Sequence, residues 1–187
     1  MRSVAAPVVA LLLVACGPAG GGTMQARWTT VADTFDVTMP ARATWCPAPQ
    51  RLDIRATAGD TGVGLAIYPV DSTGLAGDYS IVEPGGPVHF RPSAAVAIRW
   101  FGKVQVFGWW GDSGAVTLSG KPGRRLSGQA TGRLISSLGP DSTIALSLRF
   151  RGLRVETDSL CDAAAPAPAP PSDSGATPPT PPAPGID

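Results

Sequence analysis

The sequence contains no asparagine, two lysines and a single histidine, His89, and these scarcities narrow the chemistry open to the chain. One histidine and three cysteines do not supply the ligand set of a zinc site, and no loop carries three carboxylates at alternating positions as a calcium site requires. The chain also lacks a strong net charge, since its formal charge is +1 over 187 residues. Such a charge provides no electrostatic field that attracts nucleic acid. We therefore predict no metal, no cofactor and no nucleic-acid partner.

Helical periodicity is missing as well, since no 12-residue window shows helical spacing free of glycine and proline. Apolar residues recur at every second position instead, with turn residues between the runs, which is typical of short antiparallel strands. Expected strand cores lie at residues 35–39, 51–56, 63–68, 96–100, 104–107, 116–118, 126–134 and 144–150. A change of parity at Gly152 indicates a β-bulge or a corner.

We predict an all-β domain of about 8–10 short strands on this basis. The expected form is an antiparallel β-sandwich, because the runs differ in length and glycines interrupt several of them. A small lipocalin-like β-barrel is the alternative.

The first 16 residues, MRSVAAPVVALLLVAC, combine one positive charge at Arg2 with a short apolar run that ends at Cys16. This pattern is typical of an export signal, and the run is too short to cross a bilayer as a helix. The last four residues, LVAC, resemble the lipobox of bacterial lipoproteins. The resemblance implies cleavage before Cys16 and attachment of acyl chains such as palmitate to its sulfur and its new amino group. Gly17 stands where lipoproteins retained in the inner membrane typically carry aspartate. The resemblance therefore favours the outer membrane, with the domain facing the periplasm.

Composition divides the chain into four parts. Residues 1–15 form the expected signal peptide, residues 16–25 the lipidated cysteine with a glycine-rich flexible tether, and residues 26–161 the all-β domain. Residues 162–187 contain nine prolines and no basic residue. Such a segment buries too little apolar surface to offset its ordering entropy, so we expect a disordered, proline- and alanine-rich tail.

Two cysteines, Cys46 and Cys161, remain after removal of the signal. An even pair in an exported chain predicts a disulfide bond rather than a reactive or metal-binding site. The bond is expected to fix the last strand to the start of the domain.

Two short motifs resemble a catalytic pair. Asp60-Thr61-Gly62 and Asp112-Ser113-Gly114 together resemble the Asp-Thr/Ser-Gly motifs of aspartic proteases, in which two carboxylates share one proton. Each Asp here follows a glycine rather than a buried strand, and Asp173-Ser174-Gly175 repeats the string in the predicted tail. Hairpin turns explain the motifs better, because these residues suit tight turns. We predict that the chain is not an enzyme, with an aspartic-type hydrolase as a remote alternative.

Aromatic residues form the first group of candidate binding residues. Simple alternation places Trp100 and Trp110 toward the core and puts Phe101, Phe107 and Trp109 on the opposite face. If that face is exposed, it offers an apolar patch for a glycan, a lipid or a protein; burial of both faces is the competing interpretation.

Basic residues form the second group. Arg149 and Arg151 share the outward face of one predicted strand, and Arg133 is expected across from them. Such a surface suits lipid phosphates or an acidic partner, whereas a solvated sheet face is the competing interpretation. Together these features predict a lipid-anchored cell-envelope protein whose non-enzymatic β-domain has a structural or protein-interaction role. A glycan- or lipid-binding module that uses the aromatic or the basic face is the alternative.

Overall fold

The computed structural model describes residues 21–31, 33–71, 74–84, 91–102, 105–120 and 124–162, without the side chains of residues 140, 141, 160 and 162. The predicted signal peptide, Cys16, His89 and residues 163–187 of the predicted tail lie outside the described residues. Within the described ranges, no helix is long and apolar enough to cross a membrane.

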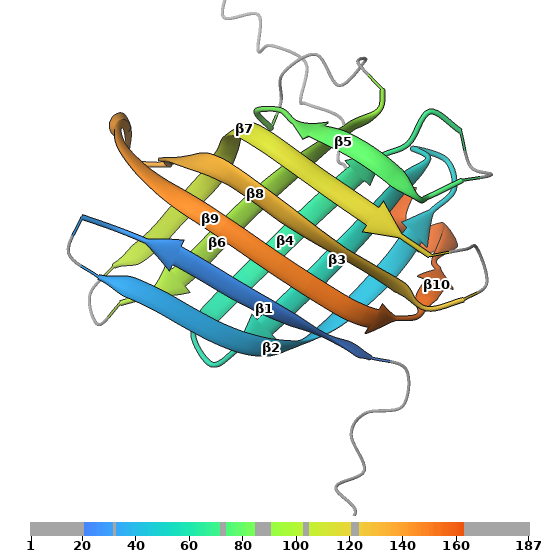
Figure 1. Ribbon diagram of the computed structural model, residues 1–187, viewed down its shortest axis with the longest axis horizontal. Helices are drawn as coiled ribbons and strands as arrows, with labels where there is room; N and C mark the ends of the chain where they lie inside the picture. The colour runs from blue at the N-terminus through green and yellow to red at the C-terminus, as the bar shows by residue number, and fades with distance from the viewer. Residues whose placement is uncertain are drawn as a thin grey trace, which may run out of the picture.

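The described residues form ten β-strands and one short 3-10 helix (Figure 1). In chain order these elements are β1 (Gly22–Thr29), β2 (Thr34–Cys46), β3 (Arg51–Ala58), β4 (Thr61–Tyr68), β5 (Gly77–Ile81), β6 (Ser93–Phe101), β7 (Val106–Ser119), β8 (Leu126–Ser136), β9 (Gly139–Leu153), β10 (Val155–Thr157) and η1 (Ser159–Asp162). The predicted all-β fold is thus confirmed.

The strands close into a barrel. Antiparallel pairing runs through β1, β2, β3, β4, β6, β7, β8 and β9, and β9 pairs again with β1. The short β5 is inserted between β6 and β7 and completes a closed nine-strand barrel, while β10 lies parallel to the end of β2. In Figure 1, β1, β9, β8 and β7 run across the front and cross β3, β4 and β6 behind them. The predicted sandwich is therefore wrong, and the barrel fits the lipocalin-like alternative.

Closure depends on β1, which begins at Gly22 inside the segment predicted to be a flexible tether. Met24, Ala26 and Trp28 alternate into the core, and the strand is hydrogen-bonded along its whole length to β2 and along most of it to β9. Residues 22–25 are thus part of the barrel. With β1 in place, neither β2 nor β9 keeps an open edge along this stretch, so the sheet closes on itself instead of splitting into two.

Apolar side chains from every barrel strand fill the interior. Five aromatic residues pack against one another there: Trp28 stacks on Phe35 with ring centroids 5.0 Å apart, and Trp100 stacks on Phe107 at 5.2 Å and on Trp109 at 6.1 Å. Aromatic pairs at such separations add to the stabilisation from buried area. The inside of the barrel is therefore a packed core.

Register shifts interrupt the pairing of the long strands at three places, and two of them bear on the predictions. One lies on β9 beside Gly152, whose φ of 71° is in the left-handed region that glycine tolerates. This confirms the bulge predicted from the parity change. The other lies on β7 between Gly111 and Ser113. Asp112-Ser113-Gly114 is therefore part of a bulged strand, and its assignment to a hairpin turn is wrong. Gly59 and Asp60 do form the predicted turn between β3 and β4.

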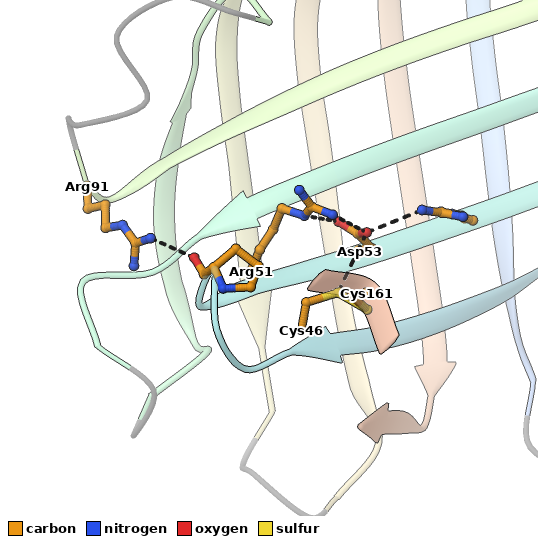
Figure 2. A network of polar contacts seen from close by, with 7 residues as sticks. Cys46, Arg51, Asp53, Arg91 and Cys161 are labelled. Carbon is orange, nitrogen blue, oxygen red and sulfur yellow. Dashed lines mark hydrogen bonds and ion pairs between the residues drawn. A yellow bond between two sulfur atoms is a disulfide. The ribbon is translucent and has the colours of Figure 1, made fainter. Parts of the chain in front are cut away.

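The predicted disulfide between Cys46 and Cys161 is present, with its Cα atoms 5.6 Å apart (Figure 2). Beside it the buried carboxylate of Asp53 accepts hydrogen bonds from Arg51 Nε at 2.7 Å and from Arg55 Nη2 at 3.3 Å. The bond with Asp53 raises the pKa of Arg51, although partial burial of the guanidinium opposes the shift. The disulfide bond between Cys46 and Cys161 fixes β10 and η1 against the end of β2, as expected from the sequence.

Candidate functional site

The three aromatic residues proposed as a shared binding face do not lie on one face. Phe107 pairs with Trp100 across β6 and β7, and Trp109 pairs with Ile98, so both point into the barrel. Trp109 is 8% exposed, whereas Phe101 is 49% exposed on the outside. The predicted face assignment is wrong because the turn between β6 and β7 sets Phe107 opposite Trp100, and register in a hairpin follows its turn. A ligand surface made of Phe101, Phe107 and Trp109 is therefore not supported.

The two carboxylates of the protease-like motifs are placed in different settings. Asp60 lies exposed in the turn between β3 and β4, and its carbonyl accepts a bond from the Phe101 amide. The Asp112 carboxylate on β7 accepts hydrogen bonds from Arg133 on β8, one of them from Nε at 2.8 Å. No hydrogen bond in the described part of the chain links the two carboxylates, and the Asp112 carboxylate is paired with Arg133 instead.

The predicted basic residues do lie on one outer surface. Arg149 and Arg151 project outward from β9, and Arg133 projects outward from the neighbouring β8. Arg133 is neutralised by Asp112, but neither Arg149 nor Arg151 has an ion-pair partner among the described residues. Two of the three predicted arginines are thus available to an external anion.

A polar groove of about 520 Å³ surrounds these two arginines on the outside of β1, β2, β7, β8 and β9, and we call it the Arg149 groove. Its floor contains one transverse row of directly paired residues. The row runs across five strands in the order Thr38, Gln25, Arg149, Gln129 and Thr117. Hydroxyl, amide and guanidinium groups therefore follow one another across β2, β1, β9, β8 and β7.

Acidic residues border this row at both sides. Gln25 Nε2 donates to Asp36 Oδ1 at 3.0 Å, and Thr117 Oγ1 donates to Asp78 Oδ1 at 2.8 Å. These bonds orient the amide of Gln25 and the hydroxyl of Thr117. Arg149 lines the groove at the centre of the row and forms no ion pair with another described residue.

Close packing below the groove explains its shape. A Cβ on Gly128 of β8 would lie 2.6 Å from Cζ of Phe150, so a larger residue there would displace the buried ring. Glycine lets Phe150 pack under β8 and leaves Gln129 as the neighbouring outward side chain. The groove thus has an apolar underside and a polar surface.

Sequence reasoning missed four members of the row, Gln25, Thr38, Thr117 and Gln129. Three of them lie in or beside predicted strands, but alternation within a strand does not show which residues are opposite one another. Gln25 was assigned to the tether. The usable signal was the run of Thr, Gln and Arg at outward positions of three neighbouring predicted strands.

A second, more apolar groove of about 560 Å³ lies on the outer face of β3, β4, β6 and β7. Gly62, Gly64 and Ala97 form its floor, and Arg55 and Trp110 stand on either side of Gly64 and Ala97 in one transverse row. The indole N–H of Trp110 is buried without a hydrogen-bond partner among the described atoms. The described residues that line this second groove include no histidine, cysteine or carboxylate.

Metal-binding clusters of three or more His, Cys, Asp or Glu side chains are not found in the part of the chain that the structure describes. Comparisons with protein-family models, with curated proteins and with solved structures give no match. The inference of function therefore rests on the chain's own residues.

Proposed function

We propose that this chain is a lipid-anchored cell-envelope protein whose barrel is a non-enzymatic binding module for an acidic glycan. The observation that carries the proposal is the Arg149 groove, in which Arg149 stands within a row of hydroxyl and amide side chains and Arg151 lies beside the row. Neither arginine has an ion-pair partner among the described residues. The amino-terminal resemblance to lipoproteins supports the anchor and a place in the envelope.

The chemistry of the groove suits a sugar polymer that carries carboxylate or phosphate groups. Guanidinium groups bind such anions with paired N–H donors, and side-chain hydroxyls and amides both donate and accept bonds from sugar hydroxyls. The packed interior leaves the outer surface as the place for a ligand. Bound ligand at this groove would cross β1, β9 and β8.

A binding measurement tests the proposal directly. Full-length protein in detergent is titrated with hexagalacturonate, an acidic probe, and with maltohexaose as a neutral probe of equal length. We expect binding of the acidic probe and at least tenfold weaker binding by Arg149→Gln, since one charge-assisted hydrogen bond contributes about 1.5–3 kcal/mol. Arg133→Gln is the matched control, because Arg133 is neutralised by Asp112 outside the groove. Equal binding of both probes, or equal loss in both variants, would contradict the proposal.

The anchor is tested separately. Metabolic labelling with a radioactive fatty acid should label the wild-type protein and not Cys16→Ser. Equal labelling of the two proteins would refute acylation at Cys16 without touching the glycan proposal.

Protein interaction is the second candidate function, and a specific surface favours it. Four exposed apolar side chains, Val31, Phe101, Val106 and Leu138, lie at or beside turns at the end of the barrel opposite Gly22. Exposed apolar residues gathered at one end are typical of a contact surface. Capture of an envelope protein by wild type and not by a Phe101→Ser/Leu138→Ser variant would support this role.

A further inference from the structure

We propose that the end of the barrel where β1 begins docks on anionic lipid headgroups of the membrane that holds Cys16, through Arg124, Arg125 and Arg154. This inference rests on the proposed lipid anchor and adds an orientation and a lipid preference to it. It involves arginines outside the Arg149 groove.

The three arginines surround the point at which the chain enters the barrel. Gly22 packs against the backbone of Gly152, since a Cβ on Gly22 would lie 2.8 Å from the Gly152 carbonyl carbon. Arg125 Nη1 donates to the Gly152 carbonyl at 3.0 Å, and Arg154 follows two residues later. Arg124 precedes Arg125 in the connection between β7 and β8.

All three side chains are exposed, and none forms an ion pair within the described residues. The acidic residues nearest along the chain, Glu156 and Asp158, lie on or just after β10, which pairs with residues 43–45 of β2 on the β2 side of the same end. Arg124, Arg125 and Arg154 lie beside the ends of β8 and β9.

Covalent geometry confines this end to the membrane surface. Six residue steps separate Cys16 from Gly22, and a chain spans at most about 3.3–3.6 Å per residue, so Gly22 lies within about 20 Å of an acylated Cys16. Electrostatic attraction to an anionic surface acts over about 8–10 Å at physiological salt. The tether therefore allows the arginines beside Gly22 to come within that range of the surface, whereas the turns at the other end of the barrel are farther from the anchor.

Energetics favour docking by this end. One basic residue near an anionic membrane surface strengthens association about fivefold, which corresponds to about 1 kcal/mol. Acyl chains hold the protein in the bilayer, and a basic patch is the second signal that commonly accompanies them. Three arginines without an ion-pair partner among the described residues therefore suffice to select one orientation of a barrel that is already tethered.

Hydrogen exchange of the full acylated protein tests the orientation. The protein is inserted into vesicles of phosphatidylcholine alone or with 30 mol% phosphatidylglycerol, and amide exchange is followed at residues 119–126 and 151–154. We expect at least fivefold slower exchange in these segments on the anionic vesicles, with the difference abolished by 1 M NaCl. Equal exchange on both vesicles would overturn the docking proposal.

Charge variants identify the arginines responsible. Arg124→Gln/Arg154→Gln should lose the dependence on phosphatidylglycerol, while Arg27→Gln/Arg99→Gln, which removes the same charge farther along the barrel, should retain it. Loss in both variants would overturn the assignment to this end. Failure of the wild-type protein to sediment with either vesicle would instead refute the lipid anchor. This result distinguishes failure of the anchor from failure of the docking orientation alone.

Discussion

Removal of the disulfide by Cys46→Ala/Cys161→Ala should destabilise the whole barrel and not just its last segment. The bond joins residues 115 positions apart. In the chain-entropy model, closing a loop of that length stabilises the folded protein by about 5 kcal/mol, because the cross-link restricts the unfolded chain. The free energy of unfolding of an ordinary domain is about 5–15 kcal/mol, so the loss of the disulfide removes a large fraction of it.

Local contacts do not replace the bond. β10 pairs with β2 over three residues, and the Asp158 amide donates to the Trp45 carbonyl at 3.0 Å. These few bonds can open in the variant without unfolding the barrel. Loss of the cross-link nonetheless increases the entropy of the unfolded chain, and this lowers the free energy of global unfolding. Local opening of β10 and global unfolding can therefore be measured separately.

Urea unfolding followed by tryptophan fluorescence is the appropriate assay, because Trp28 and Trp109 are buried in the barrel interior. With a urea dependence of about 1–3 kcal/mol per molar, the midpoint should fall by roughly 2 M or more. Wild-type protein with a reducing agent is the control and should reach the same midpoint as the variant. A loss below about 1 kcal/mol by both routes would refute the entropic argument.

Three further predictions concern packing, the buried carboxylate and pH. Gly128→Ala should destabilise by about 1–3 kcal/mol in urea unfolding because the new methyl group meets Phe150, whereas Gly64→Ala, with no atom within 4 Å of its Cβ, should not destabilise. Asp53→Asn should lower the unfolding free energy by about 1.5–3 kcal/mol through lost charge-assisted bonds with Arg51; an unchanged midpoint would show that solvent replaces them. Burial, with a smaller effect of Asp71, raises the pKa of Tyr79, so the unfolded chain should ionise first and stability should fall as pH rises above about 10. Tyr79→Phe should flatten that pH dependence, and an equal slope in both proteins would contradict the assignment.

Local features of the fold were predictable from the sequence. Alternation placed the cores of β2, β3, β4, β6, β8 and β9 correctly, and the even cysteine count gave the disulfide. The long β7 was predicted as two separate runs. The parity change at Gly152 gave the bulge. The strand cores and the bulge depend on the order of neighbouring residues, and the disulfide depends on an even number of cysteines. A single sequence contains both kinds of information.

Closure of the barrel was not predictable in the same way. β1 has three inward residues, Met24, Ala26 and Trp28, and it follows a glycine-rich stretch that favoured a tether. The strand is stabilised by hydrogen bonds to β2 and β9, which are distant in the sequence from each other. Tertiary pairing therefore outweighed a weak local preference.

The bulge at Gly111 and Ser113 explains how β7 contributes to two different surfaces of the barrel. Before it, Trp109 points into the barrel; after it, Thr117 points outward into the Arg149 groove, although both positions are odd. A strand of uniform alternation would expose Trp109 or bury Thr117, because side chains alternate strictly along a regular strand. The single extra residue thus permits β7 to contribute to the aromatic core near one end and to the polar groove near the other. Alternation measured from either half of β7 necessarily misplaces the other half.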